Sequence, residues 1–229
     1  MWREQIAALG DQFDCQVADY GQLDSLPAMA ERVLANAPAS LLLAGHSMGG
    51  RVAFEILRRA PQRVTRLVLL DTGYQPLAAG EPGERETRQR QRLVALAYAA
   101  GMRSMGQEWL RGMLPEKRWH DAALTGSILA MVERKTPQIH EAQIRALLGR
   151  PDATAVLPAI PCPTLLLCGR EDQWSPLARH EQMAALIPGA RLAVIDDAGH
   201  MTTMERPASV SAAMRDFLCA DAPSIGRAQ

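Results

Sequence analysis

The chain has 229 residues, 48% of them hydrophobic, so it can bury one substantial core but is short for two full domains. Its 25 basic residues balance 25 acidic ones, which removes the overall charge that would attract nucleic acid or an anionic membrane. The start, MWREQIAALGDQFDC, lacks the apolar stretch of a signal peptide, and no run is long enough to span a bilayer. We therefore expect a soluble cytoplasmic protein that acts on a small molecule.

The cysteines and histidines indicate neither a disulfide framework nor a metal site. The four cysteines are scattered, and two lie in or beside an aliphatic run, which is typical of reduced core residues. No pair among the five histidines has the spacing of zinc ligands. We expect no metal and no cofactor.

Strands and helices alternate toward both ends of the chain. Aliphatic runs predict strands at 13–19, 40–45, 64–71, 163–169 and 190–196. Apolar residues at helical intervals predict helices at 23–38, 49–61, 177–189 and 207–218. Because parallel strands are joined by crossover helices, the alternation predicts an α/β fold with a mostly parallel sheet of about five strands. We expect the tail after Ala220 to be disordered.

The middle of the chain interrupts this alternation. Residues 73–159 contain no convincing aliphatic strand, only charged and helical patterns separated by prolines. We therefore predict an α/β core formed by residues 1–72 and 160–229, with residues 73–159 inserted as a helical lid.

A serine stands where the strand at 40–45 turns into a helix. The sequence there is GHSMG with Ser47 at its centre, and such a turn holds the corner residue in a strained conformation. We expect the glycines two positions to either side to relieve the crowding, and His46 to point the other way as a structural residue. The hydroxyl would then project above the carboxyl ends of the strands, beside a helix start that favours negative charge. The alternatives are a turn that only packs tightly and one that cradles a phosphate.

The chain also carries a base and an acid that could activate this serine. Asp172 lies in GREDQWSP after one predicted strand, and His200 lies in DAGHMTTMERP after the last one. The order Ser47, Asp172, His200 is the order expected for nucleophile, acid and base in this type of fold. Glu171 and Asp71 are rival acids. We favour Asp172 over Glu171 because a shorter side chain fixes an imidazole more rigidly.

Three motifs resemble those of the α/β-hydrolase superfamily, in particular its small esterase-like members with a helical lid. They are GHSMGG, LLLCGREDQWSP and IDDAGHMTTMERP, and the resemblance covers residues 13–219. It implies that Ser47 is the nucleophile, His200 the general base and Asp172 its orienting acid, with the Met48 N–H as one oxyanion donor. The motifs are specific to the superfamily but not to a substrate.

The resemblance also implies a departure from the family pattern. Relatives have a strand between those matching 13–19 and 40–45, and a loop at its end supplies the second oxyanion N–H. No such segment is found here. We favour direct pairing of 13–19 with 40–45, which would bring the N–H of Gly21 to the serine. Alternatively, a second copy covers the exposed strand edge and forms a homodimer, or catalysis is impaired, since losing one donor costs about two to three orders of magnitude in rate.

The predicted lid would select the substrate. If it folds over the serine, Tyr74 and Trp109, with Trp174 from the loop of the acid, would line an apolar acyl or alcohol pocket, although most apolar lid residues could instead form the lid's own core. The arginines between 85 and 92 read as a solvated helix face, because glutamates are interleaved with them.

Three hypotheses of function follow. The first is a serine carboxylesterase for short- to medium-chain esters, which needs no cofactor. The second uses the same serine and histidine to cleave or rearrange a carbon–carbon skeleton, as lid-bearing relatives that make or degrade cyclic acids do. Such substrates carry carboxylates, so an arginine cluster in the pocket would favour it. The third is a catalytically impaired scaffold that acts by binding.

Overall fold

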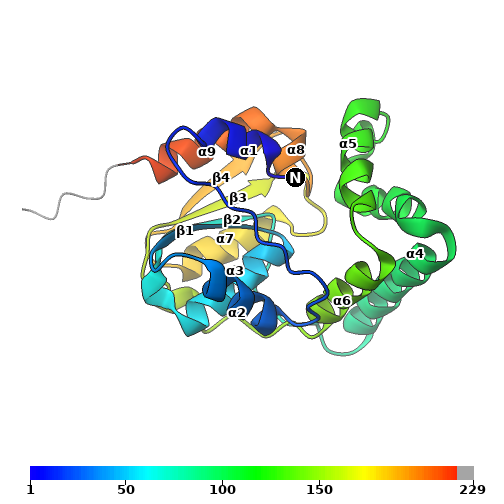
Figure 1. Ribbon diagram of the computed structural model, residues 1–229, viewed down its shortest axis with the longest axis horizontal. Helices are drawn as coiled ribbons and strands as arrows, with labels where there is room; N and C mark the ends of the chain where they lie inside the picture. Colours follow the sequence, from blue (N-terminus) through cyan, green and yellow to red (C-terminus); the bar gives the residue numbers. More distant parts are fainter. Residues whose placement is uncertain (221–229) are drawn as a thin grey trace, which may run out of the picture.

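A computed structural model describes residues 1–220, and these residues contain one sheet of four parallel strands (Figure 1). The strands follow one another across the sheet in chain order: β1 (Leu41–His46), β2 (Val64–Leu70), β3 (Thr164–Gly169) and β4 (Arg191–Ile195). In register, Gly45 lies opposite Leu69, Leu69 opposite Leu166, and Leu166 opposite Leu192. The predicted α/β class with a parallel sheet is confirmed. The tail predicted to be disordered lies outside the described residues.

Helices cover both faces of this sheet. In the sheet region they are α1 (Arg3–Leu9), α2 (Leu26–Asn36), α3 (Met48–Arg59), α7 (Leu177–Leu186), α8 (Thr202–Glu205) and α9 (Pro207–Leu218), with 3-10 turns at Pro61–Arg63 and Leu157–Ala159. α2, α3 and α7 pack on one face, whereas α1 and α9 pack on the other (Figure 1). None of the described helices is both apolar and long enough to cross a bilayer.

The core is divided by the sheet, because successive side chains of a strand point to opposite faces. Leu69 of β2 is buried in the same apolar layer as Phe54 of α3. Its neighbour Leu70 is buried in the layer that contains Phe217 of α9. Burial on both faces explains why the inner strands read as continuous aliphatic runs in the sequence.

The strand predicted at 13–19 does not form. Residues 14–20 are irregular, and β1 is an edge strand whose sheet partner within residues 1–220 is β2 alone. Phe13 and Cys15 pack instead against the apolar layer that contains Phe217, which draws the segment away from a ladder with β1. The sheet therefore has four strands in the described part of the chain, not five, and the predicted direct pairing of 13–19 with 40–45 is wrong.

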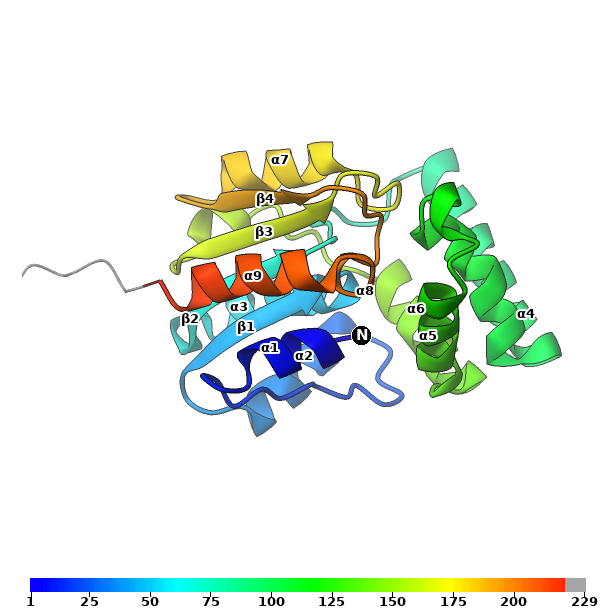
Figure 2. The ribbon, with the colours of Figure 1, turned by 90° about the horizontal axis from the view of Figure 1, so that it is seen from above.

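The residues between β2 and β3 form a group of helices beyond the carboxyl ends of the strands (Figure 2). These are α4 (Glu81–Met113), α5 (Ala122–Glu133) and α6 (Pro137–Leu148), with a 3-10 turn at Glu116–Arg118. Gly101 breaks α4 into two arms, since its φ of 83° and ψ of 167° are not helical. The long arms of α4 pack against α5 and α6. This helical group stands over the edge of the sheet where Ser47 is found.

Candidate active site

Ser47 occupies the corner between β1 and α3, with a φ of 52° and a ψ of −112° that L-residues rarely adopt. A Cβ on Gly45 would lie 2.5 Å from the carbonyl oxygen of Gly49, so position 45 has room for glycine only. A Cβ on Gly49 would meet nothing beyond its own helix closer than 3.9 Å, whereas one on Gly50 would lie 2.7 Å from Thr72. The second glycine that this corner requires is therefore Gly50, not Gly49 as the spacing suggested.

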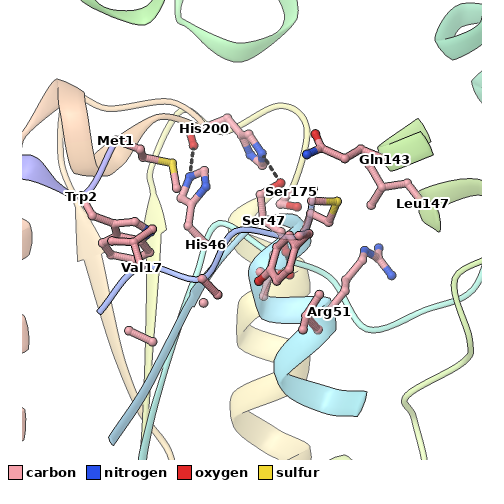
Figure 3. A pocket seen from close by; sticks show the side chains of 18 of the residues that line it. Met1, Trp2, Val17, His46, Ser47, Arg51, Gln143, Leu147, Ser175 and His200 are labelled. Atoms are coloured by element: carbon pink, nitrogen blue, oxygen red, sulfur yellow. Dashed lines mark hydrogen bonds between the residues drawn. The ribbon is translucent and has the colours of Figure 1, made fainter. Parts of the chain in front are cut away.

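Three loops bring Ser47, His200 and Asp172 into one chain of hydrogen bonds. His200 Nε2 lies 2.9 Å from Ser47 Oγ (Figure 3), and His200 Nδ1 lies 2.8 Å from Asp172 Oδ2. The serine follows β1, the aspartate follows β3 and the histidine follows β4, so all three stand at the carboxyl edge of the sheet. The structure thus brings together the three residues that the sequence motifs selected.

Asp172 is buried and accepts further hydrogen bonds from its own loop. Its Oδ1 accepts from the N–H groups of Trp174 and Ser175, each at 2.8 Å. Burial alone would raise the pKa of Asp172, but the charge of His200, its hydrogen bond and these backbone donors together lower it. An ionised Asp172 accepts the Nδ1–H of His200, which leaves Nε2 free to take a proton from Ser47.

The two rival acids do not contact the His200 ring. Asp71 is fully buried, and its Oδ1 accepts a hydrogen bond from the N–H of Gly169 at 3.0 Å. Glu171 lies at the surface and pairs with a lysine. Of the three carboxylates, Asp172 is the one that reaches His200.

His46 and Asp71 support the loop that carries His200. His46 Nε2 donates to the His200 carbonyl oxygen at 2.7 Å (Figure 3) and also lies 3.2 Å from Asp71 Oδ2. Burial opposes the protonated form of His46, but the hydrogen bond and the charge of Asp71 raise its pKa. This pair ties the corner of Ser47 to the backbone of His200.

Glu205 holds the same loop from the other side. Its carboxylate accepts hydrogen bonds from the N–H groups of Gly199 at 2.9 Å and Met201 at 3.0 Å, the two neighbours of His200. Burial raises the pKa of Glu205 to about 7, although these backbone donors act in the opposite direction. Sequence reasoning missed this residue, because nothing in the local pattern shows that a glutamate near a helix start is buried.

The two predicted oxyanion donors differ in their surroundings. The N–H of Met48 follows Ser47 directly at the start of α3, and no hydrogen bond within residues 1–220 occupies it. Gly21, in contrast, does not line the cavity at Ser47, and its N–H donates to Asp19 Oδ1 at 3.2 Å. The expectation for Gly21 is wrong because its loop closes on its own aspartate side chain, as Asx turns do.

A cavity of about 1890 Å³ opens at Ser47 and extends between the sheet edge and the helical group. Trp109 and Trp174 line it, as the sequence predicted. Tyr74 does not line it, because its ring is buried in the apolar layer between the sheet and α3 and α7, with its hydroxyl 3.4 Å from Gln182. The predicted apolar pocket therefore keeps two of its three aromatic residues.

The arginines that line this cavity include Arg51, Arg90, Arg150 and Arg179, and Glu86 lines it as well. Arg90 and Arg150 each lie 2.8 Å from a carboxylate oxygen of Glu86. Arg90 is only 8% exposed, so the expectation of a solvated face at 85–92 fails there, because helical periodicity turns this position inward. Sequence reasoning also missed Arg51, although its spacing of four from Ser47 places both on one helix face.

Within residues 1–220, one group of buried side chains has its polar atoms close enough together to hold a metal ion. Oxygen and sulfur atoms of Asp71, Cys168 and Asp172 lie within 4.8 Å of one another. Both carboxylates already accept hydrogen bonds from protein donors, and burial raises the pKa of the Cys168 thiol, which keeps it protonated. These residues fit a hydrogen-bonded framework better than a metal site.

Comparison with known proteins gives the class. The model of the alpha/beta hydrolase family matches residues 7–213, and the chain belongs to this family. Hydrolases and esterases are prominent among its relatives and structural neighbours, and the protein is an enzyme of the hydrolase class.

Individual relatives extend this result. The chain is 28% identical over 203 residues to pimeloyl-[acyl-carrier protein] methyl ester esterase of Aromatoleum aromaticum, covering 85% of this chain and 80% of that protein. It is 29% identical over 207 residues to 2-hydroxymuconate semialdehyde hydrolase of Pseudomonas sp., covering 80% of this chain but 64% of that protein. A solved structure of a thermophilic esterase from Thermogutta terrifontis, with malate bound, has 29% identity and a TM-score of 0.82, covering 95% of this chain and 84% of that one.

Proposed function

We propose that the protein is a serine carboxylesterase that hydrolyses short- to medium-chain carboxylic esters through an acyl-enzyme. The observation that carries the proposal is the 2.9 Å approach of His200 Nε2 to Ser47 Oγ, with ionised Asp172 on the opposite ring nitrogen. A base, an orienting acid and a hydroxyl that lines a cavity are the parts that acyl transfer needs. The relatives named as esterases are similar to this chain over most of its length.

The proposed reaction has two steps. Ser47 Oγ attacks the ester carbonyl while His200 Nε2 takes its proton, and Asp172 stabilises the resulting imidazolium. The N–H of Met48 and the positive end of α3 stabilise the oxyanion. His200 then protonates the departing alkoxide. In the second step it accepts a proton from the water that attacks the acyl-enzyme, and it returns this proton to Ser47 Oγ as the acyl–oxygen bond breaks. The products are the alcohol, the acid and the free Ser47 hydroxyl.

We also propose that helices α4–α6 act as the lid of this site. Trp109 of α4 and Trp174 from the loop of the acid supply apolar walls to the cavity, which would exclude water from the acyl-enzyme and limit the size of the substrate. No cofactor takes part in the proposed reaction.

Turnover of p-nitrophenyl acetate and p-nitrophenyl butyrate tests the proposal, with Ser47→Ala as the control. We expect hydrolysis by the wild-type protein and its loss in the variant. A fluorophosphonate probe should label Ser47 in the wild-type protein, which peptide mass spectrometry would locate. Absence of both turnover and labelling would contradict the proposal and favour a scaffold that acts by binding.

The arginines of the cavity favour one second candidate, a hydrolase or lyase that acts on a carbon–carbon bond with the same serine and histidine. Substrates of that reaction carry carboxylates, and the similarity to 2-hydroxymuconate semialdehyde hydrolase fits it. Fluorophosphonate labelling of Ser47 without any turnover of the p-nitrophenyl esters would support this candidate over the esterase.

The outer edge of β1 supports a proposal about assembly. It has no strand partner within residues 1–220, and an unpaired edge can pair with a second copy. We expect a homodimer by sedimentation velocity. A monomer at every concentration tested would contradict this proposal and leave the proposed esterase unaffected.

A further inference from the structure

Two guanidinium groups from different helices meet at one wall of the cavity. A Cβ on Gly73 would lie 3.0 Å from Arg51 Nη2 and 3.2 Å from Arg179 Nη1, so both groups border the same glycine. Arg51 belongs to α3 and Arg179 to α7, and both line the cavity that contains Ser47. Packing of the helices, and not neighbourhood in the sequence, brings the two cations together.

Neither of these guanidinium groups has a carboxylate partner within residues 1–220. Arg51 donates to the carbonyl oxygen of Gln75 at 2.9 Å, and Arg179 donates to the carbonyl oxygen of Trp174 at 3.3 Å. The nearby Glu86 is already engaged by two other arginines. Glu86 therefore balances Arg90 and Arg150, whereas the charges of Arg51 and Arg179 have no carboxylate paired with them in residues 1–220.

The surroundings of Arg51 disfavour the charged form of its guanidinium group. The pKa of Arg51 falls to about 9, first because burial removes water from the guanidinium and then because Arg150, Arg179 and Arg90 repel its charge. Glu86 acts in the opposite direction but does not offset these effects. A bound anion would stabilise the charged form of Arg51, since attraction between opposite charges strengthens where water is excluded.

Arg51 stands one helical turn after Ser47 on α3. Residues four apart share a helix face, and the Arg51 side chain extends into the cavity (Figure 3). The two backbone positions are separated by about 6 Å along the helix axis, given a rise of about 1.5 Å per residue. Because Ser47 and Arg51 line the same cavity, an acyl chain with its carbonyl carbon at Ser47 has a guanidinium group one helical turn away to bind a terminal anionic group.

We infer that Arg51 and Arg179 bind a carboxylate of the substrate, which would be a monoester of a short dicarboxylic acid with its ester carbonyl at Ser47. The inference rests on the proposed esterase function and specifies its substrate class. Guanidinium groups bind carboxylates through paired N–H donors, which gives orientation as well as affinity. The free carboxylate would fix one end of the acyl chain and hold the ester carbonyl against the serine.

Matched methyl esters test this inference. Monomethyl and dimethyl glutarate differ in one free carboxylate, so the ratio of their kcat/KM values measures recognition of the anion. We expect the wild-type protein to favour the monoester at least tenfold. Arg51→Gln and Arg179→Gln should each lower the ratio at least tenfold, mainly through a higher KM for the monoester. Arg88→Gln is the matched control, because Arg88 lies exposed on α4 outside this cavity, and it should leave the ratio unchanged.

Binding without turnover separates this inference from the esterase proposal. In Ser47→Ala protein, calorimetric titration should show glutarate binding that weakens at least tenfold when Arg179→Gln is added. Hydrolysis of dimethyl glutarate without preference for the monoester, together with no glutarate binding, would overturn the carboxylate site but not the esterase. Glutarate binding without hydrolysis of any ester would support the site and contradict the esterase. Tighter binding of inorganic phosphate than of glutarate would overturn the carboxylate assignment.

Discussion

His46 donates a hydrogen bond from Nε2 to the carbonyl oxygen of His200 at 2.7 Å, so the residue before the serine holds the backbone of the histidine. Two segments that are 154 residues apart in the chain are thereby coupled through one buried imidazole. Asp71 completes the connection from the end of β2. The distance between Ser47 and His200 therefore depends on residues that never touch a substrate.

Replacement of His46 by alanine should lower the free energy of unfolding by about 1–3 kcal/mol, because it removes the hydrogen-bond donor of the buried His200 carbonyl oxygen and the imidazole beside the Asp71 carboxylate. Urea unfolding followed by circular dichroism would measure this. His120→Ala is the matched control, since His120 is exposed, and it should stay within about 0.5 kcal/mol of the wild-type protein. An equal effect of the two replacements would contradict the prediction.

Asp172→Asn should reduce kcat for ester hydrolysis by about three to four orders of magnitude with little change in KM, because an amide neither holds the required tautomer of His200 nor stabilises its charge. Steady-state kinetics on p-nitrophenyl butyrate would measure the loss. Glu171→Gln changes the adjacent carboxylate, which lies at the surface, and should keep full activity. Loss of activity in Glu171→Gln alone would show that the wrong acid has been assigned.

Glu205 should make stability depend on pH below neutrality. Burial raises its pKa to about 7 in the folded protein from 4.5 in the open chain, so the folded state holds this proton more tightly. The resulting stabilisation is fully present below pH 4.5 and is lost as the pH rises through 7. Unfolding free energies of the wild-type protein should therefore fall relative to Glu205→Gln across this window. If the unfolding free energies of the two proteins change with pH in the same way, the raised pKa does not belong to Glu205.

The two glycines after the serine should respond to alanine in opposite ways. Gly50→Ala brings a Cβ to 2.7 Å from Thr72 and should destabilise the protein by about 1–3 kcal/mol. Gly49→Ala meets no close neighbour and should be neutral or stabilise helix α3 by up to about 1 kcal/mol. Thermal unfolding of both variants would measure the difference. A lower Tm for Gly49→Ala than for Gly50→Ala would contradict this account of the corner.

Local pattern was sufficient to predict the corner of Ser47 and the strands that surround it. An aliphatic run, a serine flanked by glycines and an amphipathic helix specify a strand, a turn and a helix within a few residues. The loops of Asp172 and His200 follow strands, and the carboxyl ends of parallel strands meet at one edge of a sheet. Their convergence on the serine could thus be inferred without coordinates.

Contacts between distant segments could not be inferred in this way. Periodicity shows that a position is buried, but not which segment buries it, so the same pattern allowed a strand at 13–19 that does not form and a pocket role for Tyr74, whose ring lies in the core. The approach of Arg51 to Arg179 depends on how α3 and α7 pack on the same face of the sheet. Such positions depend on long-range packing and charge, which no window of neighbouring residues contains.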